Sequence, residues 1–108
     1  MIIIGLNNIN MRKITIEAIN AFNQSKPFFK SNTTVIVDKN CVKLVLFGNI
    51  IAYKYLISKR ILKITNCGYF TNVTKERLNG LEGVFIRQKQ GDWYLNGFKW
   101  DGKLITIL

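Results

Sequence analysis

The chain has 108 residues, of which 48% are hydrophobic, and its 16 Lys and Arg residues against 6 Asp and Glu give a formal net charge of +10. This length fits one domain, and the apolar content excludes an intrinsically disordered protein. The charge excludes a decoy that imitates nucleic acid, and it favours a polyanionic partner such as nucleic acid, a nucleoprotein or an anionic membrane surface. A lysine-rich surface that serves only solubility explains the charge equally well.

Apolar stretches and terminal signals limit the class of protein further. No stretch approaches the roughly 20 consecutive apolar residues that cross a bilayer. The N-terminus lacks a basic leader and a cleavage site for export, so we expect a cytoplasmic protein without a membrane partner. Residues 1–10 carry no charge. We expect them to be a disordered leader or a short edge strand ahead of a single domain at 11–108.

The domain begins with a predicted amphipathic helix over 12–24. Its apolar face consists of Ile14, Ala18, Ala21 and Phe22. The helix must end before Pro27, because proline disfavours the helical conformation in the residue that precedes it. Residues 25–32 then form a connector, in which we expect Phe28 and Phe29 to pack under a sheet.

From Thr33 onward the pattern is that of short β-strands. Gly48-Asn49 predicts a two-residue hairpin turn, because glycine can adopt the positive φ angle that such a turn requires. The strands of this part form a predicted four-stranded antiparallel meander, at 33–38, 42–47, 50–56 and 61–65.

A second helix and further hairpins follow. Residues 72–79 predict a short helix with Thr71 as its N-cap and Gly80 as a left-handed terminator. The predicted strands after it are 83–89, 93–95, 98–100 and 104–108, joined by glycine turns. Because such short strands make few ladder hydrogen bonds, large cross-strand side chains must stabilise them. These are Trp93, Tyr94, Phe98 and Trp100. The fold class is therefore α+β: antiparallel β-meanders of about seven to eight short strands, one N-terminal helix and one short central helix.

The residue types present exclude most site chemistry. The chain contains no histidine, and its two cysteines, Cys41 and Cys67, cannot supply the four ligands of a structural zinc site. We therefore expect no metal, no cofactor and free thiols. Glu76 and Glu82 are not spaced as a catalytic carboxylate pair, and no phosphate-binding loop is present, so we expect no enzyme. An enzyme that uses Arg77 with Glu76 is the remaining catalytic alternative.

Basic residues gather near the hairpin of the third strand and near the short second helix, where they can follow a phosphate backbone. Alternation along the third strand places Tyr53, Tyr55 and Ile51 on one face. Lys54 lies on the opposite face. We expect both tyrosines in the core rather than in a base-stacking platform. The predicted interface with nucleic acid or a protein partner consists of Lys54, Lys59, Arg60, Lys63, Lys75, Arg77, Arg87, Lys89 and Lys99.

Four stretches carry a further signal, and they are NTTV (32–35), LVLFGNIIA (44–52), CGYFTNVTKERLNGL (67–81) and WYLNGFKWDG (93–102). Together they resemble a family of small proteins encoded in bacteriophage and prophage genomes. The similarity extends over most of residues 12–104, and the leader departs from it. The resemblance implies a phage accessory context and transfers no catalytic residue. Phage genes of this size often encode anti-defence factors, and by this association an anti-defence role is one expectation.

The leading hypothesis is a non-enzymatic phage accessory protein of the bacterial host cytoplasm. Its basic surface binds nucleic acid or a nucleic-acid-handling host complex such as a CRISPR effector, and it takes no small-molecule substrate. An anti-CRISPR or other anti-defence inhibitor is one such protein. The alternative is a protein-interaction or self-assembling module whose charge is incidental. It rests on residue types that are enriched at interfaces and on short strands whose edges a second copy can extend.

Overall fold

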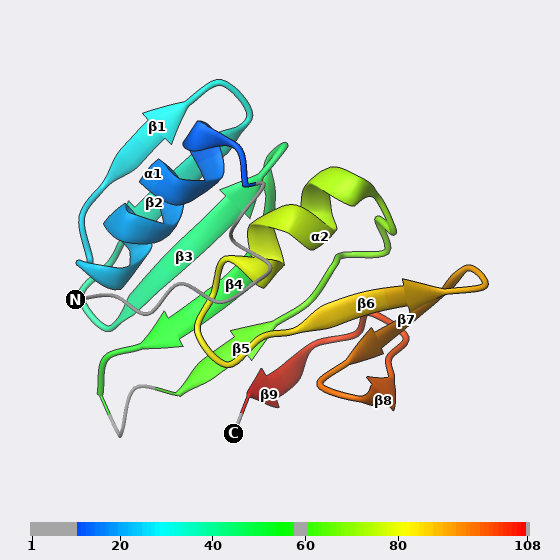
Figure 1. Cartoon of the computed structure of the whole chain (residues 1–108). Coiled ribbons are helices and arrows are strands. Elements are labelled where there is room, and N and C mark those ends of the chain that lie inside the picture. The colour runs from blue at the N-terminus through cyan, green and yellow to red at the C-terminus, as the bar shows by residue number, and fades with distance from the viewer. Residues whose placement is uncertain (1–10, 58–60, 108) are drawn as a thin grey trace.

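The computed structural model describes residues 11–57 and 61–107 (Figure 1), so the expected leader lies outside the described residues. Within these ranges the chain forms two helices and nine strands. The elements are α1 (Lys13–Asn23), β1 (Phe28–Lys30), β2 (Thr33–Val37), β3 (Cys41–Leu46), β4 (Asn49–Tyr55), β5 (Leu62–Ile64), α2 (Asn72–Asn79), β6 (Ile86–Lys89), β7 (Asp92–Leu95), β8 (Phe98–Lys99) and β9 (Ile105–Ile107). The predicted α+β fold is confirmed.

The strands form two antiparallel sheets. The larger sheet has the order β1-β2-β3-β4-β5-β9, and the smaller has the order β6-β7-β8. The predicted meander corresponds to β2 through β5 and is confirmed. The sheet is wider than predicted, because β1 is added at one edge and β9 at the other.

Strand β1 takes the place of part of the predicted connector. Phe28 pairs with Val35 of β2, and Phe29 pairs with Thr34. Neighbouring residues of a strand point to opposite faces of a sheet. Phe28 therefore packs against the core, while Phe29 is 77% exposed. The expectation that both phenylalanines pack under the sheet is wrong for Phe29.

Strand β9 joins the larger sheet, although the sequence predicts that it continues the C-terminal hairpins. Ile105 of β9 pairs with Ile64 of β5. The carbonyl of Gly102 accepts hydrogen bonds from the backbone N–H of Asn66 (3.0 Å) and from the hydroxyl of Thr65 (2.7 Å). These bonds hold the chain beside the end of β5, so the following residues pair with that strand as β9.

Both helices cover the same face of the larger sheet (Figure 1). The buried residues of α1 are Thr15, Ala18, Ile19 and Phe22. The predicted apolar face is thus confirmed at Ala18 and Phe22, while Ile14 and Ala21 lie half-buried at its margins. No helix among the described residues is long and apolar enough to cross a membrane.

One hydrophobic core joins the two sheets. Leu44 and Ile64 of the larger sheet belong to the same buried cluster as Ile86 and Leu95 of the smaller sheet. Each sheet therefore directs one face into this cluster. The side chains of the other face point outward.

The aromatic residues of the C-terminal hairpins divide between core and surface. Trp93 and Trp100 are buried, with 1% and 6% of their surface exposed. Tyr94 is half-buried. Phe98 is 79% exposed and stabilises the hairpin less than predicted, because its ring lies largely in solvent on the two-residue edge strand β8.

Two glycine positions differ from the prediction. The turn between β3 and β4 consists of Phe47 and Gly48, with φ angles of 50° and 79°, rather than of Gly48 and Asn49. Two successive positive φ angles define the twisted turn that hairpins favour. Gly80 has a φ angle of −74° and is not a left-handed terminator. A Cβ atom at Gly80 would lie 2.6 Å from Cγ1 of Ile19, so the absence of a side chain there lets α2 approach α1.

The turn at Gly102 provides a test of how the two sheets are joined. Gly102 has a φ angle of 85°, and a Cβ atom there would overlap the buried side-chain amide of Asn66. Gly48 has a similar φ angle of 79°, but its Cβ would enter open space. Gly102→Ala should lower the free energy of unfolding by about 3 kcal/mol, and Gly48→Ala by about 1 kcal/mol. Urea unfolding of both variants measures these changes in the free energy of unfolding. Equal losses of stability would contradict the close contact of Gly102 with Asn66.

Candidate nucleic-acid interface

The nine basic residues predicted to form the interface fall into different environments. Lys59 and Arg60 lie outside the described residues. Two of the others have their charged groups bonded within the fold, and one contacts a buried tryptophan. Four lie on outward faces of the two sheets. The nine residues therefore do not form one continuous basic surface.

Arg77 is buried, so its prediction as a surface contact is wrong. Its side chain is 1% exposed and lies between α1 and the larger sheet. The guanidinium donates to the hydroxyls of Thr33 (3.1 Å) and Thr15, and to the Glu76 carboxylate (3.0 Å). Burial lowers the pKa of the Arg77 guanidinium, and the charge of Glu76 opposes this shift. Arg77 therefore connects α2 to α1 and β2.

The sequence contained a signal for this burial. Thr74, Arg77, Leu78 and Leu81 recur at the spacing of one helix face, and all four are buried. Glu76 accepts a second hydrogen bond, of 2.7 Å, from the backbone N–H of Arg12 at the start of α1. Arg77 and Glu76, the residues that a catalytic role would use, thus both bond α2 to α1.

Lys54 also serves the fold. Its ammonium group donates to the carbonyls of Phe22 (2.6 Å) and Asn23 (3.1 Å), the last residues of α1. It lies 5.2 Å from the centre of the Phe22 ring. Carbonyls at the end of a helix lack partners within the helix, and a cation there is favourable. Lys54 therefore binds the C-terminus of α1 instead of forming part of a basic surface.

Lys75 extends from α2 toward the smaller sheet. Its ammonium group donates to the side-chain carbonyl of Gln88 (2.9 Å) and lies 5.9 Å from the ring centre of Trp93. Trp93 is on the core-facing side of β7. Lys75 consequently helps to attach α2 to this sheet.

Three of the predicted residues come together on the outward face of the smaller sheet. Arg87 of β6 pairs with Tyr94 of β7, and Tyr94 pairs with Lys99 of β8. The three side chains form one cross-strand line, which we call the Tyr94 row. Lys89 and Asp92, one pair further along, lie on the same face.

The charges around the Tyr94 row are accessible. Arg87, Lys89 and Lys99 are exposed, and Tyr94 is half-buried between its neighbours. Lys99 and Asp92 form an exposed ion pair of 3.6 Å. Such a pair contributes little to stability and can open. The face thus presents three cations and one carboxylate around an aromatic ring.

The larger sheet carries a similar line on the face that the helices leave uncovered. Lys43 of β3 pairs with Tyr53 of β4, and Tyr53 pairs with Lys63 of β5. We call this line the Tyr53 row. Lys54 points to α1, so by alternation Tyr53 and Tyr55 point to the other side. Both tyrosines are half-buried there and are absent from the core cluster, so their assignment to the core is wrong.

A β-bulge explains why the strand pattern misplaced these tyrosines. The pairing of β3 with β4 shifts between Leu44 and Val45, where Ile51 is the extra residue of β4. Ile51 and Ala52 are both buried in the core cluster, although they are adjacent. Strict alternation from Ile51 therefore assigns the residues after it to the wrong face.

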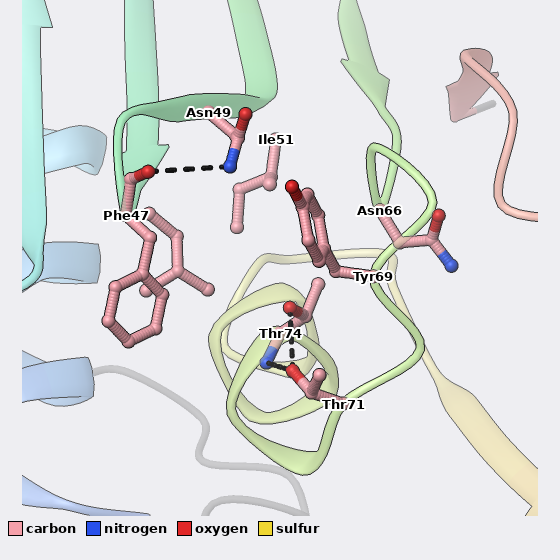
Figure 2. A pocket seen from close by; sticks show the side chains of 8 residues that line it. Phe47, Asn49, Ile51, Asn66, Tyr69, Thr71 and Thr74 are labelled. Carbon is pink, nitrogen blue, oxygen red and sulfur yellow. Dashed lines mark hydrogen bonds between the residues drawn. The ribbon is translucent and has the colours of Figure 1, made fainter.

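A pocket of about 270 Å³ opens beside the turn between β3 and β4 (Figure 2). Its lining residues are Leu46, Phe47, Asn49, Ile51, Asn66, Tyr69, Thr71 and Thr74. Several of their polar groups bond to near neighbours: Asn49 donates to the Phe47 carbonyl (3.3 Å), and the hydroxyls of Thr71 and Thr74 are 2.9 Å apart. Thr71 also accepts from the Thr74 backbone N–H, which confirms the predicted N-cap of α2. Tyr69 is the one ionisable side chain among these residues.

The two cysteines are free thiols, as predicted. Cys41 is buried and Cys67 is exposed. Desolvation raises the pKa of both thiols, which lowers the fraction of reactive thiolate at neutral pH. The described residues contain no group of three or more His, Cys, Asp or Glu side chains that could hold a metal ion.

Comparison with known proteins identifies one family. The family model described as Kyanoviridae Gp96 protein matches residues 11–106. No curated protein and no solved structure matches the chain. The match confirms the phage origin that the sequence resemblance implies.

Replacing Arg77 tests its structural role. Arg77→Met removes the charge and takes away the donor that the Thr15 and Thr33 hydroxyls share, while the Glu76 carboxylate keeps only its bond from the Arg12 backbone N–H. The free energy of unfolding should fall by about 3 kcal/mol, because removing one partner of a buried polar cluster leaves the others unsatisfied. The control Arg87→Met removes an exposed arginine and should change stability by no more than about 0.5 kcal/mol. Urea unfolding gives both values, and equal stability of the two variants would refute the assignment of Arg77.

Proposed function

We propose, from the premise that this chain belongs to the Kyanoviridae Gp96 family of bacteriophage proteins, that it is a non-enzymatic module which binds single-stranded nucleic acid through the Tyr94 row. The observation that carries this proposal is the register of the smaller sheet. It sets an aromatic ring between an arginine and a lysine on one outward face.

The chemistry of the Tyr94 row suits a nucleic acid strand better than other polyanions. A single strand offers both phosphates and unpaired bases, so it can bond to Arg87 and Lys99 while a base stacks on Tyr94. A duplex hides the faces of its bases within the stack. An anionic membrane or an acidic protein satisfies the cations but leaves the ring without a matching planar partner. The combination of ring and cations therefore favours the single strand.

Known magnitudes set the expected strength of binding. Stacking of one base on an aromatic side chain contributes about 1–3 kcal/mol. Each neutralised phosphate of a single strand adds about 0.7 to the slope of log affinity against log salt concentration. A surface with one ring and three cations should thus bind weakly and with strong dependence on salt. It should show little preference for sequence.

The phage context gives the proposal a more specific form. A protein that occupies single strands inside an infected cell competes with host complexes that handle the same strands. An anti-defence role against a nucleoprotein such as a CRISPR effector follows from this competition. The support for it is the family membership together with the Tyr94 row.

A self-assembling module is the second candidate, and a separate observation favours it. Phe98 in the edge strand β8 is 79% exposed, and Phe85, directly before the opposite edge strand β6, is 47% exposed. Exposed rings beside an unpaired strand can be covered by a second copy of the chain. Sedimentation across a range of concentrations, without nucleic acid, tests this candidate directly. A monomer at all concentrations excludes it.

Fluorescence anisotropy with labelled single-stranded DNA and RNA tests the nucleic-acid proposal. The double variant Arg87→Gln, Lys99→Gln should lower the salt slope by roughly 1.4, because two phosphate contacts are lost. The matched control Lys13→Gln, Lys26→Gln removes the same total charge from exposed positions of and beside α1. It should leave the slope nearly unchanged. If both double variants weaken binding equally, the Tyr94 row is not the contact surface.

The tyrosine is tested separately from the charges. Tyr94→Leu keeps an apolar side chain on the sheet but removes the ring, and it should weaken binding by about 1–3 kcal/mol in the same assay. Tyr94→Phe keeps the ring and should bind like the unaltered protein. Equal binding by the Leu and Phe variants would contradict a stacking role.

A further inference from the structure

We infer that the uncovered face of the larger sheet is a second binding surface for single-stranded nucleic acid, formed by the Tyr53 row together with Tyr55. The inference rests on the proposed function, since it extends the same chemistry to a second surface. It adds that one copy of the protein can hold two separate strands at once.

One arrangement of side chains is repeated on the two sheets. In each sheet a tyrosine of one strand lies directly between two cations, one on each of the two strands beside it. Directly opposed residues are near enough to contact a ligand together. Lys43 and Lys63 flank Tyr53 as Arg87 and Lys99 flank Tyr94. Two strands of unrelated length and sequence thus present the same group of side chains.

The two tyrosine rings of this face offer a flat surface on which a base can stack. The rings of Tyr53 and Tyr55 are nearly parallel, at 10°, with their centres 6.2 Å apart. This distance is less than two base-stacking spacings of roughly 3.4 Å each, so a base cannot enter between the rings. It can stack on the outer side of the pair. The Lys63 ammonium group lies 5.8 Å from the centre of the Tyr55 ring, within reach of a phosphate next to such a base.

The charges on this face define its polar contacts. The Lys43 ammonium group forms an ion pair of 2.7 Å with Asp38. A hydrogen bond to Asp38 raises the pKa of Lys43, which therefore stays protonated at neutral pH. Asp38 cancels part of this charge, so Lys63 is the main cation of the Tyr53 row. Ile36, 41% exposed on the same face, extends the apolar part of the surface beside Lys43.

The two rows point away from the core that the sheets share. The inner faces of both sheets contribute to one core cluster, for example through Leu44 and Ile86. The Tyr53 row and the Tyr94 row lie on the faces of their sheets that point away from this core. We therefore expect that a strand of a few nucleotides on one row does not reach the other. Two short strands can bind at the same time, and the protein then bridges them.

Calorimetric titration with oligothymidylate of about six nucleotides, near the site size of a small binding domain, tests the inference. The unaltered protein should bind two oligonucleotides per chain. The variant Tyr53→Leu, Lys63→Gln should bind one, and so should Arg87→Gln, Lys99→Gln. The combination of all four substitutions should bind none. The conservative variant Tyr53→Phe should retain both sites because it keeps the ring.

The outcomes separate this inference from the proposed function. One oligonucleotide per unaltered chain, lost on changing Arg87 and Lys99, overturns the inference and leaves the proposed function standing. One oligonucleotide lost on changing Tyr53 and Lys63 alone overturns both. A second readout is energy transfer between two oligonucleotides with different labels. It should occur with the unaltered protein and disappear with either double variant, and its persistence in the Tyr53→Leu, Lys63→Gln variant would contradict bridging. Circular dichroism melting confirms that each variant is folded.

Discussion

The shared core is the constraint on which the rest of the structure depends. Side chains alternate between the two faces of a strand. Leu44, Ile64, Ile86 and Leu95 enter the same buried cluster, so one face of each sheet is directed inward. The residues between them must point outward, and antiparallel pairing then places them in lines across neighbouring strands. The positions of the Tyr53 row and the Tyr94 row thus follow from the packing of hydrophobic residues on the opposite faces of their sheets.

The same packing decides which cations are available to a partner. Arg77 and Lys54 hold the two helices to the sheets, and their charges are satisfied by hydroxyl, carboxylate and carbonyl groups within the fold. The net charge of +10 therefore overstates what the surface offers. On the sheets, Lys63, Arg87 and Lys99 each lie directly opposite a tyrosine. A ring between cations provides a flat apolar contact together with charge. This combination distinguishes the surface from one whose basic residues serve only solubility.

Local patterns in the sequence predicted much of the fold. Helical spacing identified both helices, and glycine positions marked most of the hairpins correctly. The errors came from contacts between distant segments. The pairing of β9 with β5 depends on bonds from Asn66 and Thr65 to Gly102, and no local pattern encodes these. The burial of Arg77 depends on Thr15 and Thr33, which lie 62 and 44 residues away in the chain. The bulge at Ile51 shifted the assignment of Tyr53 and Tyr55, because a one-residue irregularity exchanges the faces of all later residues. The sequence named Arg87, Lys89 and Lys99 among the basic residues, but their common face depends on the pairing register of β6, β7 and β8.

The central claim is that the outward face of the smaller sheet contacts single-stranded nucleic acid, and nuclear magnetic resonance measures this contact most directly. Titration of isotope-labelled protein with a short oligonucleotide reports on each backbone amide. The account predicts chemical-shift changes at Arg87, Tyr94 and Lys99, with the amides of α1 unaffected. Changes confined to α1 and to the pocket around Tyr69, with β6, β7 and β8 unaffected, would contradict it.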